Sequence, residues 1–290
     1  MSQPDTSSDH LLRFTFADTA IRGAIIRLGT SYHDALRHQI YTPPVQHLLG
    51  QSLAAAGLLS STLKMDGLLA LQARSEGSLP LLLAECHSRG ELRGIARGAD
   101  GATDPAFHSL LRNGHLAISL MPASGQRYQG IVALDGSNLA ECLESYFRHS
   151  EQLATRLWLA ADAGHAGGLL LQRLPGSSDE DAAAWGHLQV LAETLKSEEL
   201  TGLPPETVLH RLFHQESLQV LGVQALCARC SCSRTRTMEA LISLGRRELD
   251  SIIAEQGEIV THCQFCNREY RYSPADIASL PIASGGAASH

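Results

Sequence analysis

The sequence of 290 residues lacks an apolar run long enough to cross a membrane. Its most apolar stretch, residues 45–63, is interrupted by His47, Gln51 and several serines, whereas a helix that crosses a bilayer needs about 20 mostly apolar residues. Residues 1–10 are polar and acidic and do not have the basic start and apolar segment of a secretory signal. We therefore expect a cytoplasmic protein with no membrane partner.

Positive charge is also scarce, because 23 Lys and Arg stand against 30 Asp and Glu and give a formal net charge of -7. Affinity for nucleic acid comes mainly from Lys and Arg that displace counterions, so we expect no nucleic-acid partner. The glycines at 164, 167 and 168 are not followed by Lys-Ser or Lys-Thr, and the chain contains no serine-nucleophile elbow. The sequence therefore gives no sign of a nucleotide-driven or hydrolytic enzyme, and we predict that the protein is not an enzyme.

What the sequence does contain is an ordinary globular composition, with 44% hydrophobic and 18% charged residues. Strand-like runs occur at residues 12–16, 21–28, 68–73 and 116–121, and helices are predicted from Pro43 or Pro44 to about Leu63 and over residues 139–147. Strands and helices do not alternate regularly, as they do in doubly wound folds. The pattern predicts an α+β fold with a mixed, largely antiparallel sheet and helices.

A change in composition near Pro175 marks a boundary, because turn-forming residues are followed there by an acidic trio at 179–181. We predict an N-terminal α+β domain over residues 1–178, an amphipathic helical linker over 179–225 and a small zinc-binding domain over 226–275. Residues 276–290 are predicted to form a C-terminal tail that is disordered after Leu280.

The predicted linker carries two apolar stripes. One consists of Trp185, Leu188, Leu191 and Leu195, and the other, after a Pro-Pro pair, of Val208, Leu209, Leu212 and Phe213. Isolated helices shorter than about 12–15 residues are marginal in water. The linker must therefore gain stability from the surface that covers these stripes, although ordinary domain helices would show the same pattern.

Cysteine is the strongest chemical signal in the chain. Five of the seven cysteines lie between residues 227 and 266, which favours reduced thiols in a cytosol over a secreted disulfide framework. Cys230 and Cys232 precede two predicted helices separated by Gly245, and Cys263 and Cys266 follow them. Zinc favours four thiolates in a tetrahedron, and a unit of this size needs a metal or disulfide to hold its small core.

The spacing of the cysteines alone decides neither which of them bind zinc nor what the site does. Cys227 and Cys230 also form a Cys-x-x-Cys pair, so a conventional zinc ribbon that binds nucleic acid is one rival, although the near-neutral charge of this unit disfavours it. A thiol-disulfide oxidoreductase is another, but it needs a helix after Cys266, where residues 269–272 predict a strand. The remaining histidine and cysteine candidates are interpreted as exposed or buried structural residues: His210, His214, His262, Cys86 and Cys142.

Several motifs along the chain form a recognisable set. One is Cys-x-Cys followed about thirty residues later by Cys-x-x-Cys, with Gly257-Glu258-Ile259 before the second pair. The N-terminal motifs are Arg22-Gly23, Arg127-Tyr128-Gln129-Gly130, Tyr146-Phe147, Ser150-Glu151-Gln152, Arg156 and Gly167-Gly168. Together they resemble the bacterial thirty-three-kilodalton heat-shock family of redox-regulated holdase chaperones. The resemblance covers nearly the whole chain, and Cys227 departs from its pattern.

The resemblance implies one zinc ion held by Cys230, Cys232, Cys263 and Cys266 in the reduced form. It also implies ATP-independent binding of unfolding proteins, dimerisation on activation and transfer of clients to an ATP-dependent foldase. On this basis we expect oxidation to form the disulfides Cys230–Cys232 and Cys263–Cys266. The linker residues expected to contact clients are Trp185, Leu188, Leu191, Leu195, Leu212 and Phe213.

Overall fold

The structure is a computed structural model that describes residues 9–64, 66–99, 101–176 and 178–280. The chain divides into two compact units, one that ends at Arg229 and one that begins at Cys230. The tail that is predicted to be disordered, residues 281–290, lies outside the described residues. Within those residues no helix is both long and apolar enough to span a bilayer. The predicted α+β class with antiparallel sheets is confirmed.

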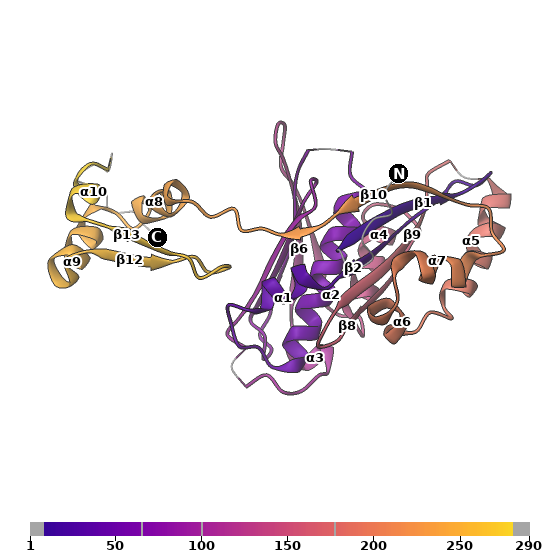
Figure 1. Cartoon of the computed structure of the whole chain (residues 1–290), viewed down its shortest axis with the longest axis horizontal. Coiled ribbons are helices and arrows are strands. Elements are labelled where there is room, and N and C mark those ends of the chain that lie inside the picture. The colour runs from indigo at the N-terminus through magenta and orange to yellow at the C-terminus, as the bar shows by residue number, and fades with distance from the viewer. Residues whose placement is uncertain (1–8, 65, 100, 177, 281–290) are drawn as a thin grey trace. The chain divides into compact units, whose positions relative to one another are not determined.

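The first unit contains two sheets (Figure 1). Sheet A has the strand order β10-β1-β2-β9-β8, and every neighbouring pair is antiparallel. Its strands are β1 (His10–Phe16), β2 (Ile21–Leu28), β8 (Thr155–Ala161), β9 (Ala166–Arg173) and β10 (Leu218–Ala225). Strand β9 is buried along nearly its whole length because side chains pack on both faces of sheet A.

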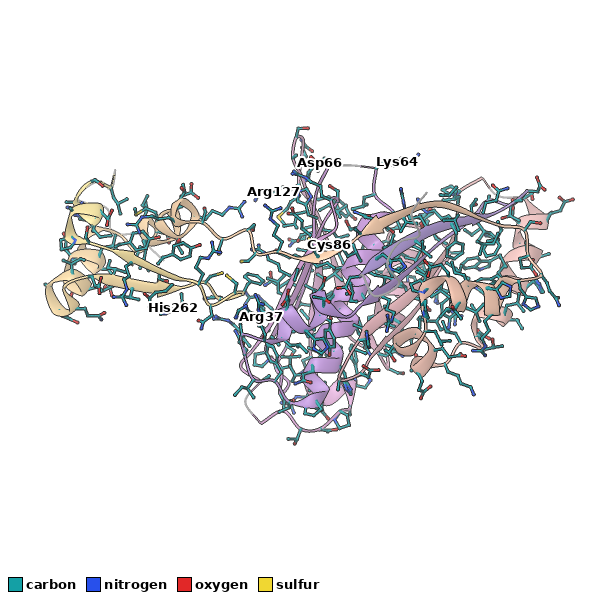
Figure 2. All side chains as sticks on the ribbon, viewed as in Figure 1. Arg37, Lys64, Asp66, Cys86, Arg127 and His262 are labelled. Carbon is teal, nitrogen blue, oxygen red and sulfur yellow. The ribbon has the colours of Figure 1, made fainter. Side chains whose placement is uncertain are left out.

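Sheet B has the order β11-β5-β4-β3-β6-β7, and only the pair of β11 with β5 is parallel. Its strands are β3 (Gly67–Arg74), β4 (Leu81–His87), β5 (Glu91–Arg97), β6 (His115–Pro122), β7 (Tyr128–Ala133) and β11 (Cys227–Ala228). Cys86 lies in β4 with 2% of its surface exposed, as predicted for a small buried hydrophobe, and Figure 2 labels it.

Helix α2 (Pro43–Ser61) contacts strands of both sheets and forms much of the larger core. It begins at a Pro-Pro pair, as predicted, because proline suits the first turn of a helix. A β-carbon on Gly57 would lie 2.4 Å from Cδ1 of Ile26, so the glycine allows the helix to approach sheet A closely. The other helices here are α1 (Thr30–Leu36), α3 (Phe107–Leu110) and α4 (Leu139–His149), the last capped by Asn138.

Helices α5 (Asp179–Ala192), α6 (Ser197–Gly202) and α7 (Pro205–Phe213) follow sheet A strand β9 in the chain (Figure 1). Their apolar side chains form a second core together with residues of sheet A. The Phe213 ring lies with its centroid 5.2 Å from that of Phe16 and 6.3 Å from that of Phe14. The prediction of a helical linker over residues 179–225 is wrong for its last part, because Leu218–Ala225 form β10. This segment pairs with the otherwise unpaired edge of β1, and those backbone hydrogen bonds favour a strand.

The second unit contains α8 (Arg234–Ile242), α9 (Arg246–Gln256), the antiparallel pair of β12 (Ile259–His262) and β13 (Glu269–Tyr272), and α10 (Pro274–Ala278). Gly245 separates α8 from α9 with a φ of 85°, which favours glycine. The prediction that residues 276–290 form a tail is wrong at its start, because Ile277 in α10 is only 1% exposed and belongs to the small core.

Candidate metal centre in the second unit

The four predicted cysteines meet in one cluster of the second unit. The Sγ atoms of Cys230, Cys232, Cys263 and Cys266 all lie within 4.8 Å of one another. Two of these contacts are 3.5 Å, one between Cys230 and Cys263 and one between Cys232 and Cys266. Each of these two contacts joins a cysteine that precedes α8 and α9 to one that follows them, so the cluster brings together two segments that the helices separate in sequence.

This spacing fits a tetrahedral thiolate site. Ligands about 2.3 Å from a central zinc ion stand ~3.8 Å from one another in a regular tetrahedron. Two of the sulfur pairs are 3.5 Å apart and all four sulfur atoms lie within 4.8 Å of one another, so the observed distances are close to this spacing, and all four cysteines are partly buried. The cluster can therefore hold a metal ion, and a set of four soft sulfur donors suits zinc or iron rather than magnesium or calcium.

The local backbone explains how the second pair is held. The Cys263 amide donates to the carbonyl of Arg268, and the Asn267 amide donates to the carbonyl of Cys263, at 2.9 and 2.8 Å. Asn267 adopts a φ of 53°, which asparagine tolerates better than most residues. The turn thus reverses the chain between β12 and β13 and directs both thiols into the cluster.

The thiols of Cys230 and Cys232 differ in pKa. Burial raises the pKa of Cys230 to about 12, and hydrogen bonds with neighbouring thiols act in the same direction. Burial also acts to raise the pKa of Cys232, but the Tyr270 phenol donates a hydrogen bond to its sulfur at 3.0 Å and other thiols donate as well. These hydrogen bonds lower the pKa of Cys232 to about 7. Cys232 is therefore the thiol in this pair that ionises more readily.

A protein-family model described as "Hsp33 protein" matches residues 9–273 of the chain. The "33 kDa chaperonin" of Ectopseudomonas mendocina (strain ymp) is 51% identical over 288 residues, which is 97% of this chain and 98% of that protein. The chain belongs to the Hsp33 family. The resemblance stated from the motifs is thereby confirmed.

Two further comparisons agree with this assignment. The "33 kDa chaperonin" of Pseudomonas aeruginosa (strain UCBPP-PA14) is 48% identical over 285 residues, 96% of this chain and 96% of that protein. The crystal structure of the 33 kDa chaperonin from Thermotoga maritima has a TM-score of 0.79 at 20% identity and covers 93% of this chain and 96% of that one. The crystal structure shows a common fold.

Other predicted candidates in this Hsp33-family chain lie outside the cluster. Cys227 is exposed in β11, where it pairs with Glu91 of β5. His262, labelled in Figure 2, neighbours Cys263 in sequence but lies 3.4 Å from a carboxylate oxygen of Glu269. His210 and His214 are exposed at the C-terminal end of α7. None of these four belongs to the metal-binding group found among the described residues.

The structure places the predicted linker residues in the second core of the first unit. Leu188, Leu212 and Phe213 are 2%, 5% and 2% exposed. Trp185, Leu191 and Leu195 are partly buried and pack against the same core. Sheet A therefore covers the apolar stripes that the sequence left without a partner.

The sequence interpretation missed the two tyrosines of β13. Tyr270 donates to the sulfur of Cys232, and the Tyr272 phenol donates to the Arg234 carbonyl at 3.0 Å while its ring lies 4.4 Å from the Arg234 guanidinium. Both side chains are buried because alternate residues of β13 face the core. The signal that could have found them is the Tyr-x-Tyr alternation in the predicted strand 269–272, which begins three residues after Cys266.

Proposed function

We propose that this protein is a redox-regulated, ATP-independent holdase chaperone that binds unfolding proteins and prevents their aggregation. The observation that carries the proposal is the group of four sulfur atoms in a unit with very little core of its own. Membership of the Hsp33 family and relatives named 33 kDa chaperonin support the chaperone function. We place the protein in the cytoplasm, where thiols remain reduced until stress.

In the reduced form we assign one zinc ion per chain to Cys230, Cys232, Cys263 and Cys266. The donor set supports this choice, since zinc is commonly held by four thiolates in structural sites. Bound there, zinc would supply a structural crosslink between the two ends of the unit. Tyr270 would orient and stabilise the Cys232 thiolate through its hydrogen bond.

Oxidation removes the ligand set. An oxidant such as hypochlorous acid, or peroxide with heat, converts Cys230 and Cys232 to one disulfide and Cys263 and Cys266 to another. Each disulfide forms when two thiolates together lose two electrons to the oxidant, which takes up protons from solvent and is reduced to chloride and water, or to water in the case of peroxide. Sulfur atoms joined in a disulfide no longer donate as thiolates, so the site loses its affinity for metal.

Loss of the metal site should unfold the second unit. Structural zinc contributes about 10–16 kcal/mol in small domains, which is comparable to the whole stability of a typical protein, about 5–15 kcal/mol. The remaining core consists of a few side chains near β12, β13 and α9. Disulfides between cysteines so close in sequence close very short loops and recover little of this energy.

We further propose that unfolding of the second unit destabilises the region 179–225 that precedes it. Detachment of α5–α7 would expose the apolar side chains that now pack on sheet A: Trp185, Leu188, Leu191, Leu195, Leu212 and Phe213. Exposed apolar surface of this kind binds unfolding clients. The activated form is proposed to be a homodimer that transfers clients to an ATP-dependent foldase.

A direct test follows the aggregation of a chemically unfolded client by light scattering with reduced and with oxidised protein. Zinc released during oxidation is measured with a colorimetric chelator. We expect suppression of aggregation only after oxidation, together with release of about one zinc per chain. Equal suppression by the reduced, zinc-loaded protein would contradict the redox switch, and no suppression by either form would contradict the chaperone function.

A further inference from the structure

A cavity of about 290 Å³ lies in the first unit where the two sheets approach the C-terminal end of α2. Strands β2 and β9 of sheet A and β3, β6 and β7 of sheet B all contribute to it, as do α2, α4 and the loop after α4. The apolar part of its lining consists of Leu59, Leu63, Leu69, Ile118, Leu120, Phe147 and Leu153. Because pockets near this size with an apolar body and a few polar groups bind small molecules, the cavity is a candidate ligand site.

The polar groups of this cavity include a cation without a carboxylate partner. Arg22 donates from Nε and Nη2 to Oε1 of Gln172 at 3.1 and 2.5 Å, and from Nη1 to the Thr62 carbonyl at 3.4 Å. Among the described residues Arg22 takes part in no ion pair with a carboxylate. Burial of the guanidinium lowers its pKa, which means that the charged form is poorly solvated.

Hydrogen bonds with a buried neighbour fix the position of the Arg22 guanidinium. Gln172 is 1% exposed, and its amide nitrogen donates to the Thr155 hydroxyl at 2.9 Å, which directs its oxygen toward Arg22. The guanidinium is therefore held at the cavity wall by neutral oxygen atoms only. An anion that enters the cavity would supply the charge that these oxygens do not.

The carboxylate that lines the same cavity is already satisfied. Glu151 Oε1 accepts hydrogen bonds from the phenols of Tyr146, at 2.6 Å, and Tyr128, at 3.0 Å. Burial and the hydrogen bond to Glu151 raise the pKa of Tyr146, so its phenol remains a donor. Glu151 is an exposed residue, so water can also solvate its charge, whereas the Arg22 guanidinium is partly buried. This difference favours an anionic over a cationic ligand.

A neighbouring cavity of about 200 Å³ shares Arg22, Thr62 and Leu63 with the first. Its lining adds Arg13 and Lys64 and contains no acidic side chain. Lys64, labelled in Figure 2, follows the end of α2. The side of Arg22 that faces this second cavity therefore has a positive potential, which also attracts anions.

We propose that the first cavity binds a small amphipathic carboxylate, with its apolar chain among the leucines and its carboxylate on Arg22. The proposal goes beyond the chaperone function, which gives this cavity no role. The proposal also assigns one role, ligand binding, to residues of the N-terminal motifs that are distant in sequence but line the same cavity: Arg22, Tyr128, Tyr146, Phe147 and Glu151.

The test uses the reduced, zinc-loaded full chain, so that it does not depend on chaperone activity. Octanoate, octanol and octylammonium are titrated separately by isothermal calorimetry below their aggregation concentrations. They share the same alkyl chain and differ in charge. We expect octanoate to bind about tenfold or more tightly than octanol, and octylammonium to bind least.

Variants assign the binding to the cavity. Arg22→Met should weaken octanoate by about tenfold or more and leave octanol unchanged, and Arg22→Lys should restore part of the difference. Leu63→Trp should abolish binding of both by filling the cavity. Arg112→Met is the matched control, because it removes an exposed arginine that lines neither cavity and should change neither affinity.

Two outcomes would overturn the proposal. One is an octanoate affinity no greater than that of octanol or octylammonium in the parent protein. The other is binding of octanoate that survives both Arg22→Met and Leu63→Trp. Circular dichroism shows whether Arg22→Met folds. If it does not, the affinities of octanoate, octanol and octylammonium for the parent protein and for Leu63→Trp still test the proposal.

Discussion

In the four-cysteine unit the buried core consists of a few side chains around β12 and β13, whereas α5, α6 and α7 bury theirs against the phenylalanines of sheet A. Both regions are built from short elements that are marginal in isolation. The stability of the four-cysteine unit depends on a cluster of sulfur atoms, and the stability of α5–α7 depends on the apolar surface of sheet A. We therefore expect oxidation to unfold the four-cysteine unit directly, whereas α5–α7 are released only when their packing on sheet A is lost.

The largest effect is expected from removal of one sulfur ligand. Cys266→Ser opens the four-thiolate site, so we predict loss of tight zinc binding and unfolding of residues 230–280. Zinc content after gel filtration and the proteolysis rate of this unit measure the effect. Cys227→Ser is the matched control, since Cys227 lies outside the cluster, and it should keep one zinc per chain. Tight zinc binding by Cys266→Ser would contradict the four-ligand assignment.

The next effect concerns packing on sheet A. Leu212→Asp places a charge in the core beside Phe213 and should cost several kcal/mol, which exceeds what α7 can supply alone. We predict suppression of client aggregation by the reduced protein, faster proteolysis between residues 179 and 220, and full zinc content. Leu191→Asp should act in the same direction but more weakly, because Leu191 is only partly buried.

Val190→Asp is the control for these variants, because Val190 lies beside Leu191 on α5 but is 64% exposed. It should leave both proteolysis and chaperone activity unchanged. If Leu212→Asp is cut rapidly in the linker yet remains inactive, the client-binding surface does not arise from detachment of α5–α7 and must lie elsewhere.

A smaller effect is expected at the start of α5. The Asp181 carboxylate accepts hydrogen bonds from the amides of Ala20 and Ser178, both at 2.7 Å, and joins α5 to the turn between β1 and β2. These hydrogen bonds, the one from Ala20 first, lower the pKa of Asp181 below its ordinary 3.8. Its folded pKa is depressed, so its contribution is present above pH 3.8 and lost as the pH falls through the folded pKa.

Asp181→Asn should therefore weaken α5 at neutral pH but not at a pH below the folded pKa of Asp181. Amide hydrogen exchange of residues 179–192 at several pH values measures this difference. An equal difference between variant and parent at every pH would show that the ionised carboxylate does not hold the helix.

The smallest effect is expected from the ion pair between Arg211 and Glu199, which joins α7 to α6 at a partly exposed position. Exposed ion pairs contribute about 0–1 kcal/mol, so Arg211→Met should change the free energy of unfolding by no more than that. Urea denaturation measures it. A larger loss would mean that charge, as well as packing, holds these helices.

Much of the fold followed from local sequence. The strand-like run at residues 21–28 and the Pro-Pro pair at the start of the predicted helix indicated β2 and α2 with nearly the observed bounds. Strands β4 and β5 were missed, in part because the buried Glu85 and its partner Arg93 place charges inside them. Strand β10 was missed because its stability comes from the edge of β1, which is distant in sequence.

The candidate site was predicted more completely than its surroundings. Spacing alone left Cys227 as a rival ligand, and the family resemblance selected Cys230, Cys232, Cys263 and Cys266. The sulfur atoms of these four cysteines lie together in the structure. The role of Tyr270 and the cavity at Arg22 depend on which strands become neighbours. Such contacts between distant segments are not encoded in any local pattern.

The central claim is that loss of the four-cysteine centre releases α5–α7 from sheet A. Amide hydrogen exchange measured by mass spectrometry on the reduced and the oxidised protein tests it most directly. We predict that oxidation strongly accelerates exchange in residues 230–280 and in residues 179–213, while α2 remains protected. Continued protection of residues 179–213 in an oxidised protein that suppresses client aggregation would contradict the claim.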